Sequence, residues 1–403
     1  MFEKALILRA GNETADLGLI AETVFLYGST HLLLNRGSVT ALAEAIPAGD
    51  LIAFLDRDEI KLSYVRKAFG VHASGYPKTY DLGGFELYSA GVGEKRLNYR
   101  DEIALSLERA LGKSSQTRKL ATAIADRAKL HRFKGETVDN SIPGMARADV
   151  RDQSFLKKAV VTTLSHLVPD YKLSQFHFRI FDTGKGFAVD TNLDFQAINA
   201  AYHKSVPPSH STIDPAYLLA HILDARADLF FAAHYMAEPV TAPIYHDIIQ
   251  IKHFDFLRRR YDNVAEAELF REMVVPEFPT IREVMNSGER SFAEFLRLLD
   301  KADKFKKWIQ KANPDAGLVH EYHKAVTAQT WADKLGPKSA RFAIATGLGL
   351  AADAIAPTGI GTALGVSVGA ADSFILDRLL KGWRPNQFIA DPYRKFVTPR
   401  SDS

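Results

Sequence analysis

Three residues with metal-binding or proton-transfer chemistry share one side of a helix that we expect to begin at Pro215. His221, Asp224 and Asp228 lie within about 60° of one another around that helix. Two carboxylates one turn apart, with an imidazole beside them, can bind a divalent metal or share a proton. The spacing matches no metal signature such as His-Glu-x-x-His. These residues are the candidate catalytic and metal site on the helix 215–238, and a solvent-facing stripe on an otherwise buried helix is the alternative.

A glycine-rich turn between two alternating strands carries the next group of polar residues. Asp182, Asp190 and Asp194 surround it, and carboxylates at strand ends can hold magnesium in nucleases. No Glu-x-Lys partner strand accompanies them, so we assign Asp194 to the start of the next helix. The turn at 183–186, Thr-Gly-Lys-Gly, lacks the upstream glycine and the final Ser/Thr of a phosphate-binding loop. A strand follows it, and we interpret it as a β-hairpin turn.

A basic face is expected on a helix over 117–132. Arg118, Lys119, Lys129 and Arg132 gather on one side of this helix. They could contact phosphates, and a solvated face is the alternative. The chain has 51 basic and 48 acidic residues, a formal net charge of +3, whereas a dedicated nucleic-acid-binding protein usually shows a strong basic excess. The composition argues against that class and leaves room for a local basic face.

The most distinctive pattern is a glycine-rich helical hairpin over 339–380. Two uncharged stretches rich in alanine, glycine and leucine flank Asp353, and a Pro-Thr-Gly sequence marks the turn. In the second stretch Gly361, Gly365 and Gly369 recur about one helical turn apart and line one face. A mid-helix glycine costs about 1 kcal/mol relative to alanine, so three of them favour a compensating close backbone contact. The expected partner is the same chain, a second copy of it or a lipid bilayer.

This hairpin is too short and too acidic to span a membrane by default. A spanning helix needs about 20 apolar residues, and the first arm falls well short of that length. Asp353 would sit at the deepest point of any insertion, where a carboxylate costs about 2.5–3.5 kcal/mol. Basic residues at both bases of the hairpin nevertheless suit contact with an anionic membrane surface. They are Lys338, Arg341, Arg378, Lys381 and Arg384.

The order of elements predicts an α+β protein of three parts. Residues 1–100 mix short strands and helices and are expected to form a small mixed α/β domain. Residues 101–213 contain helices, a linker near 136–148 and the β-hairpin. Residues 214–403 are expected to be helical throughout and to end in the glycine-rich hairpin and a tail. In the first part we expect strands at 4–9, 30–34, 59–66 and 83–90, and helices at 15–27 and from a Ser38 cap to Ile46.

Composition excludes several classes of site. Cysteine is absent, so disulfides, thiolate metal sites and a catalytic cysteine are excluded. No Gly-x-Ser-x-Gly elbow occurs, no glycine-rich dinucleotide loop opens a helix after a strand, and no cofactor can be assigned. The first apolar run, at 5–8, is shorter than the roughly 7–15 residues of a signal-peptide core. We therefore expect a cytoplasmic protein, peripheral to the membrane only on activation.

Three functions follow from these patterns. The first is a non-enzymatic interaction or effector protein whose hairpin mediates self-association, giving a homo-oligomer, or conditional membrane contact. The second is a metal-dependent hydrolase or nuclease that uses the candidate site on the helix 215–238. The third is a regulatory module whose N-terminal domain senses a ligand. We rank the first highest because the glycine repeat is the clearest non-random pattern in the sequence.

The close contact expected at the glycine repeat can be tested with Gly365→Leu. A leucine side chain would keep another backbone from approaching, so the variant should lose its oligomer and melt at a lower temperature. Size-exclusion chromatography with light scattering and thermal melting measure the two effects. An unchanged oligomer together with an unchanged melting temperature would refute the close contact.

Overall fold

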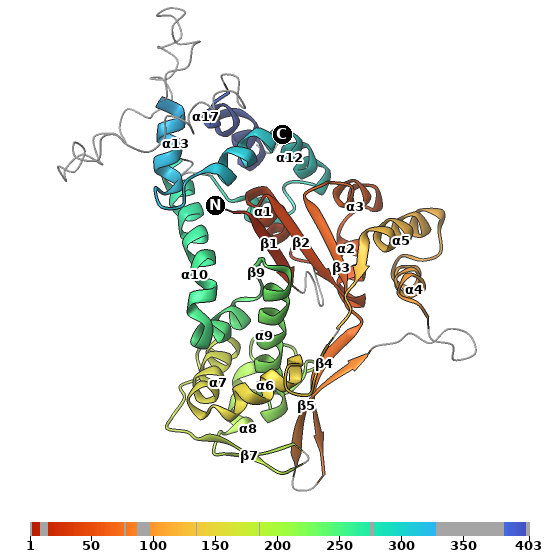
Figure 1. Cartoon of the computed structure of the whole chain (residues 1–403), viewed down its shortest axis with the longest axis vertical. Coiled ribbons are helices and arrows are strands. Elements are labelled where there is room, and N and C mark those ends of the chain that lie inside the picture. The colour runs from red at the N-terminus through yellow and green to blue at the C-terminus, as the bar shows by residue number, and fades with distance from the viewer. Residues whose placement is uncertain are drawn as a thin grey trace, which may run out of the picture. The chain divides into compact units, whose positions relative to one another are not determined.

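A computed structural model describes residues 2–8, 15–75, 78–86, 97–133, 135–184, 186–274, 278–327 and 383–399. The chain forms two compact units, of which the larger is built mainly from Phe2–Ala265 and Pro279–Leu296. The smaller comprises Glu266–Phe278 and Arg297–Thr398. Figure 1 shows a parallel sheet, an antiparallel sheet and many helices, which confirms the expected α+β class.

The larger unit contains a five-stranded parallel sheet with the order β6-β3-β2-β1-β9. All neighbouring strands are parallel, and the core residues of the interior strand β1 are at most 5% exposed. Such burial on both faces is typical of parallel sheets, whose connecting helices cover the strands. The strands are β1 Lys4–Leu8, β2 Ser29–Leu34, β3 Ile60–Tyr64, β6 Ala128–Leu130 and β9 Glu238–Val240.

Helices cover the two faces of this sheet unequally. The chain moves steadily from β1 through β2 and β3 to β6, and right-handed crossovers place the connecting helices on one face. Strand β9 joins the other side of β1, so the helix that precedes it, α9 Pro215–Tyr235, packs on the opposite face. The Tyr235 ring lies 4.2 Å from the His31 ring, which identifies the α9 face as the His31 face. The connecting helices are α1 Leu17–Leu26, α2 Arg36–Ala45, α3 Ala48–Leu55, α4 Tyr99–Leu111 and α5 Ser115–Arg127.

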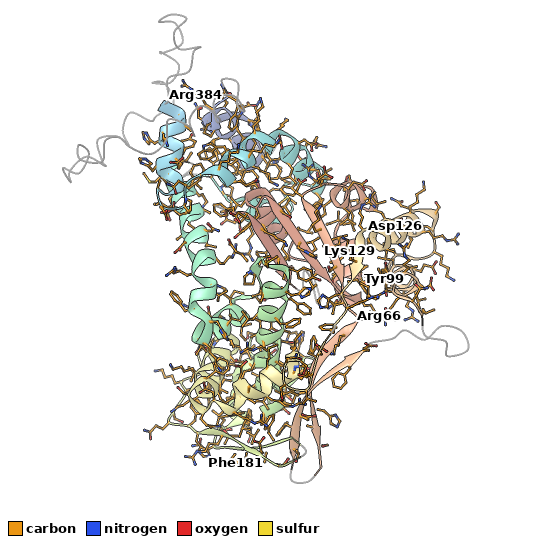
Figure 2. All side chains as sticks on the ribbon, viewed as in Figure 1. Arg66, Tyr99, Asp126, Lys129, Phe181 and Arg384 are labelled. Carbon is orange, nitrogen blue, oxygen red and sulfur yellow. The ribbon has the colours of Figure 1, made fainter. Side chains whose placement is uncertain are left out.

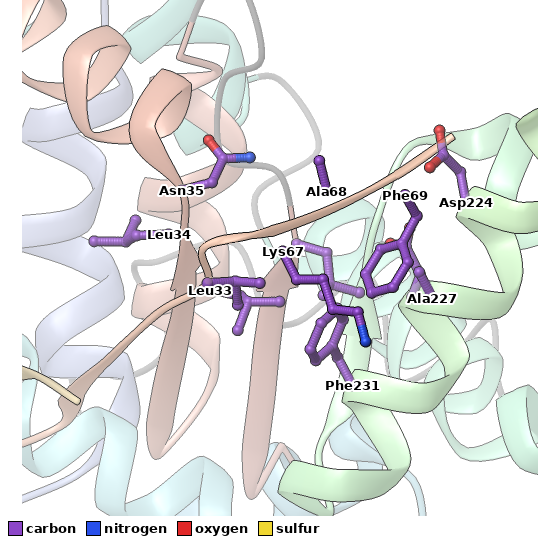
Figure 3. A pocket seen from close by; sticks show the side chains of 12 residues that line it. Leu33, Leu34, Asn35, Lys67, Ala68, Phe69, Asp224, Ala227 and Phe231 are labelled. Atoms are coloured by element: carbon purple, nitrogen blue, oxygen red, sulfur yellow. The ribbon is translucent and has the colours of Figure 1, made fainter. Parts of the chain in front are cut away.

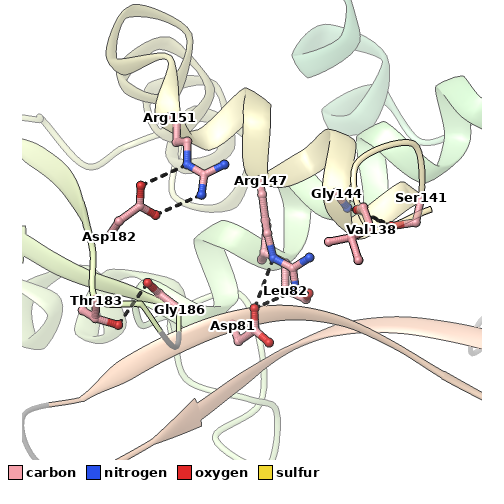
Figure 4. A network of polar contacts seen from close by, with 10 residues as sticks. All are labelled: Asp81, Leu82, Val138, Ser141, Gly144, Arg147, Arg151, Asp182, Thr183 and Gly186. Atoms are coloured by element: carbon pink, nitrogen blue, oxygen red, sulfur yellow. Dashed lines mark hydrogen bonds and ion pairs between the residues drawn. The ribbon is translucent and has the colours of Figure 1, made fainter.

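A four-stranded antiparallel sheet with the order β4-β5-β8-β7 is inserted between the parallel strands along the chain. Its strands β7 and β8 form the β-hairpin expected from the alternating pattern. The backbone N–H and the hydroxyl of Thr183 both donate to the Gly186 carbonyl, at 2.9 and 3.0 Å (Figure 4). Gly186 has φ of +149°, and a Cβ there would collide with the Tyr80 carbonyl oxygen. The strands are β4 Lys67–Ser74, β5 Thr79–Glu86, β7 Phe178–Asp182 and β8 Phe187–Thr191.

The segment expected to be a linker near 136–148 contains the start of helix α6, Ile142–Arg151. Ser141 caps this helix by accepting from the Gly144 N–H at 3.2 Å, and Pro143 lies in its first turn. Serine followed by proline is a helix start as well as a loop signal, which is why the sequence pattern is ambiguous here. Two further helices of the larger unit follow, α7 Gln153–Leu167 and α8 Phe195–Tyr202.

A buried carboxylate joins α6, α9 and the long helix α10, Pro243–Val274. Asp149 is 3% exposed. Its carboxylate accepts hydrogen bonds from the Nε and Nη2 of Arg226, at 2.5 and 2.6 Å. Lys252 donates to the same carboxylate at 3.0 Å. Helix α10 bends at His253, whose backbone leaves the helical region, and the His253 Nε2 lies 3.2 Å from Arg226. The ion pair therefore fixes three helices around one buried charge.

The smaller unit is helical, as expected for the C-terminal region. Aromatic rings fill its core, and the Phe388 ring stacks on the Phe305 ring at 4.8 Å. This contact holds the C-terminal tail against α12 Phe292–Lys311. The expectation of helices alone after residue 214 is wrong at β9. The remaining elements of the chain are α11 Ile281–Asn286 in the larger unit, and α13 Leu318–Thr327, α17 Pro385–Phe388, a π-helical turn Ile389–Tyr393 and α18 Arg394–Val397 in the smaller.

Removal of the buried carboxylate should destabilise the larger unit far more than removal of an exposed one. Asp149→Ala leaves the largely buried guanidinium of Arg226 without its carboxylate, so the free energy of unfolding should fall by on the order of 3 kcal/mol. The matched control is Asp182→Ala, which removes the exposed pair with Arg151 (Figure 4). Its loss should stay below about 1 kcal/mol. Urea denaturation measures both, and equal losses would contradict the role given to Asp149.

Candidate functional site

A crevice of about 170 Å³ lies at the carboxyl ends of the parallel strands in the larger unit. Strand-end residues Leu8, Leu34 and Val65 form part of its lining, and Asp224 and Asp228 of α9 contribute carboxylates. Figure 3 shows this sheet-edge crevice with its labelled side chains. In open α/β sheets, ligands bind outside the carboxyl ends of the strands where the strand order reverses. Here that reversal falls between β1 and β9, and Leu8 at the end of β1 lines the crevice.

The two aspartates of the sequence-based candidate site both line the sheet-edge crevice. Asp228 is 1% exposed and accepts a short hydrogen bond from the Thr241 hydroxyl, just beyond β9. Asp224 is less buried and accepts from the Tyr245 hydroxyl at 3.4 Å. The pair therefore presents carboxylate chemistry to a cavity, with one member fixed by the sheet end and the other closer to solvent.

His221 takes no part in the crevice lining. Its Nδ1 lies 3.0 Å from the Tyr217 carbonyl oxygen, one turn earlier in α9, and its ring lies 4.8 Å from the Tyr217 ring. The imidazole is thus outside the crevice lining, although its ring lies 5.7 Å from the ring of Tyr245, whose hydroxyl donates to Asp224. Within the described part of the chain, no three histidine, aspartate or glutamate side chains converge on a metal position. His221 and Asp228 are buried, so the alternative of a solvent-facing stripe is wrong.

Lys67 is the cation of the sheet-edge crevice, and its charge is already engaged. Its Nζ lies 2.5 Å from the Glu136 carboxylate and 4.7 Å from the centroid of the Phe133 ring. Figure 3 shows its side chain directed toward Phe69 and Phe231. A lysine held by a carboxylate and an aromatic face is poorly placed to bind a further anion.

Asn35 forms the opposite rim of the crevice and starts α2. Its side chain accepts from the Ser38 N–H at 2.9 Å, while its own N–H donates to the Ser38 hydroxyl at 2.8 Å. This reciprocal arrangement is a capping box. The N-cap therefore lies three residues before Ser38, the cap that the sequence pattern suggests, because asparagine caps as well as serine does.

Sequence reasoning missed a polar network on the α9 face of the parallel sheet. The His31 Nε2 lies 3.0 Å from the Ser63 hydroxyl, and the His31 ring lies 4.2 Å from the Tyr235 ring. The Tyr235 hydroxyl lies 2.8 Å from the His131 Nδ1, and the His131 and His234 rings are 4.8 Å apart. The only signal for this network in the sequence is that single polar residues interrupt apolar strand patterns. Which of these residues come together depends on the strand order.

Burial and positive neighbours disfavour protonation of this network. Loss of solvation, followed by the charges of Lys4 and the other histidines and of Lys129, lowers the pKa of His31 to about 4. Burial and the nearby His234 lower the pKa of His131 to about 4 as well. Both imidazoles are therefore neutral near pH 7. Each then has one ring nitrogen that donates a hydrogen bond and one that accepts.

The other candidate residues have structural roles or lie outside the described part. Asp194 caps α8 by accepting from the Ala197 N–H at 2.9 Å, as assigned from the sequence. Asp190 pairs with His177 at 3.3 Å. Arg384 donates to the Val326 carbonyl at 3.0 Å within the smaller unit. The residues outside the described part are Gly361, Gly365, Gly369, Lys338, Arg341, Arg378 and Lys381, with the rest of the glycine-rich hairpin.

Comparisons of the chain with protein-family models, curated proteins and solved structures find no match. In the described ranges, no single helix is long and apolar enough to cross a membrane. Helices α2 and α3 reach the required hydropathy only as a pair bent by 120°. The sheet-edge crevice and the faces of the parallel sheet are therefore the features that bear on function.

The lowered pKa values of His31 and His131 predict that stability falls as the solution becomes acidic. The unfolded chain binds protons below about pH 6.5, whereas the native imidazoles resist protonation down to about pH 4. The contribution of the two neutral histidines to the free energy of unfolding should be fully present above about pH 6.5. It should decrease between about pH 6.5 and about pH 4, by about 1 kcal/mol per histidine after allowance for solvent screening.

Urea denaturation at pH 7 and pH 5 measures this loss. The double variant His31→Gln/His131→Gln should lose less stability between the two pH values than the parent chain, because neither glutamine titrates. The exposed His210→Gln serves as the control. An equal pH dependence in the double variant and the parent would contradict the assignment.

Proposed function

We propose that this chain is a regulatory protein whose larger unit binds a small polar ligand in the sheet-edge crevice. The observation that carries the proposal is the position of Asp224 and Asp228 at the carboxyl ends of parallel strands. A buried carboxylate beside a cavity is costly unless it is hydrogen-bonded. Asp228 has such a bond from Thr241, and it also lines the space that a ligand would occupy.

The lining favours a ligand rich in hydrogen-bond donors. Asp224 and Asp228 offer acceptors, Asn35 can offer both donors and acceptors, and Lys67 is neutralised by Glu136. Phe69 and Phe231 supply apolar surface. Hydroxyl or amino groups, as in a sugar, a nucleoside or a small amine, match this set. An anionic ligand would meet two carboxylates and a lysine that is already paired.

The crevice supports binding, and self-association through the glycine repeat is the proposed response. The proposed self-association is supported only by the spacing of Gly361, Gly365 and Gly369 in the sequence. A metal-dependent hydrolase gains no support from the described residues. His221 does not line the crevice with Asp224 and Asp228, and no three such side chains in the described part of the chain converge on a metal position. Sensing followed by assembly therefore combines the crevice with the strongest sequence pattern.

Asp224→Asn tests the ligand proposal at the more exposed of the two carboxylates. Probes are ribose, adenosine, glucosamine and spermidine, compared with citrate and glucose 6-phosphate. At least one neutral or cationic probe should raise the melting temperature of the parent chain. A hydrogen bond to a charged group contributes about 1.5–3 kcal/mol, so the variant should bind that probe roughly 10- to 100-fold more weakly by calorimetry.

The matched control is Asp170→Asn, an exposed aspartate after α7 that is outside the crevice lining. Its affinity should equal that of the parent chain. Stabilisation by the anionic probes alone, or equal affinity in the Asp224 variant, would overturn the proposal.

A further inference from the structure

Part of the His31 face of the parallel sheet is exposed in the described part of the chain. Helix α9 packs on the β1 and β2 part, where Leu6 and Leu33 join the hydrophobic core. On β3 and β6, Lys61 and Lys129 are exposed. Lys129 is labelled in Figure 2 and pairs in register with Ser63, which places it on the same face as His31.

The charges on this face all have one sign. Alternation along the strands places Lys4, His31, Lys61, Ser63 and Lys129 on it. No carboxylate occupies a position on this face in the described strands. Besides burial, these same charges, those of Lys4 and Lys129, lower the pKa of His31.

Aromatic rings continue this basic surface along the end of β6 and the last turns of α9. The His131 and Phe133 rings are 4.5 Å apart, and the Phe133 ring stacks with the Phe230 ring at 6.3 Å and 22°. The Phe230 ring in turn stacks with the exposed His234 ring at 6.2 Å and 17°. We call Lys61, Lys129, Phe133, Phe230 and His234 the basic–aromatic surface, and His131 is buried next to it.

A hollow of about 450 Å³ adjoins the aromatic end of this surface. Phe230 and His234 line it, together with Arg226 and His253. No carboxylate contributes to its lining. A planar heterocycle could therefore stack on the exposed His234 ring.

We infer that the basic–aromatic surface binds single-stranded nucleic acid. Exposed lysines neutralise backbone phosphates, and aromatic side chains stack with unpaired bases whatever their sequence. A duplex keeps its bases stacked inside the helix and would use the lysines alone. A neighbouring row of rings therefore favours the single strand. The near-balanced total charge is compatible with this inference, because the surface is local.

This surface is distinct from the sheet-edge crevice, so the inference does not depend on the proposed ligand. The experiment uses the full chain with fluorescein-labelled oligo(dT) and oligo(U) and with a DNA duplex of equal length. Fluorescence anisotropy should show tighter binding of a single strand than of the duplex. It should also show weakening with salt.

Lys61→Glu/Lys129→Glu is the test of the phosphate contacts. Both side chains are exposed, so the fold should persist, as circular dichroism and thermal melting can verify. Affinity for the single strand should fall at least tenfold. Two charge-neutral substitutions, Lys61→Gln/Lys129→Gln, should reduce the slope of log K against log salt by about 1.4, at about 0.7 per phosphate contact.

The matched control is Arg118→Glu/Lys119→Glu, which makes the same charge change at two exposed residues of α5. This variant should bind as the parent does. His234→Ala removes an exposed ring and should weaken single-strand binding about fivefold or more, at roughly 1–3 kcal/mol per stacked base, with little effect on duplex binding.

Three outcomes would overturn the inference. The first is no binding of either single strand at low salt. The second is equal loss in the α5 control and the Lys61/Lys129 variants. The third is duplex binding as tight as single-strand binding and unaffected by His234→Ala, which would leave only a general attraction to polyanions.

Discussion

The packing of α9 on one half of the parallel sheet is the constraint on which the larger unit depends. Leu218, Ile222 and Leu229 of this helix are buried in the same core as strand residues Leu6 and Leu33. Burial of such side chains stabilises by roughly 1.5–3 kcal/mol each, which fixes the axis and rotation of the helix. A fixed rotation then decides which polar residues of α9 face the crevice, the sheet and α6.

Three polar residues of α9 have a partner from another element. Arg226 meets Asp149 of α6, Asp228 meets Thr241 beyond β9, and Tyr235 meets His131 beyond β6. An unsatisfied buried polar group costs about 1–3 kcal/mol, so these pairs set the position of the helix more sharply than apolar contact can. They also explain why a helix with a nearly continuous apolar surface tolerates charged residues in its interior turns.

The parts of the fold that can be predicted from the sequence are those with local signals. The apolar run at β1, the alternating β7–β8 hairpin and the helix that begins at Pro215 all carry their own pattern, and the structure confirms them. Strands β6 and β9 have three residues each, and β9 contains Pro239. Neither segment has a strand pattern of its own. Each forms a strand because it pairs with a neighbour, β6 with β3 and β9 with β1.

The candidate site follows the same division. Helical periodicity was sufficient to group Asp224 with Asp228, because both lie on one helix. It could not separate them from His221, since that depends on a hydrogen bond within the turn and on what packs against each side. His31, Ser63 and His131 come from three strands, and only the strand order brings them together.

The strand order also places the two proposed binding surfaces on one rigid element. Asp228 lines the crevice and His234 ends the basic–aromatic surface, about 9 Å apart along α9 at about 1.5 Å per residue. A ligand that shifts α9 at the crevice would therefore move the rings that stack with bases. Thermodynamic linkage makes any such coupling reciprocal, so an oligonucleotide would change the affinity of the crevice for its ligand by the same factor. The Tyr235 network, which anchors that end of α9 to the sheet, would resist the movement and so limit the size of the coupling.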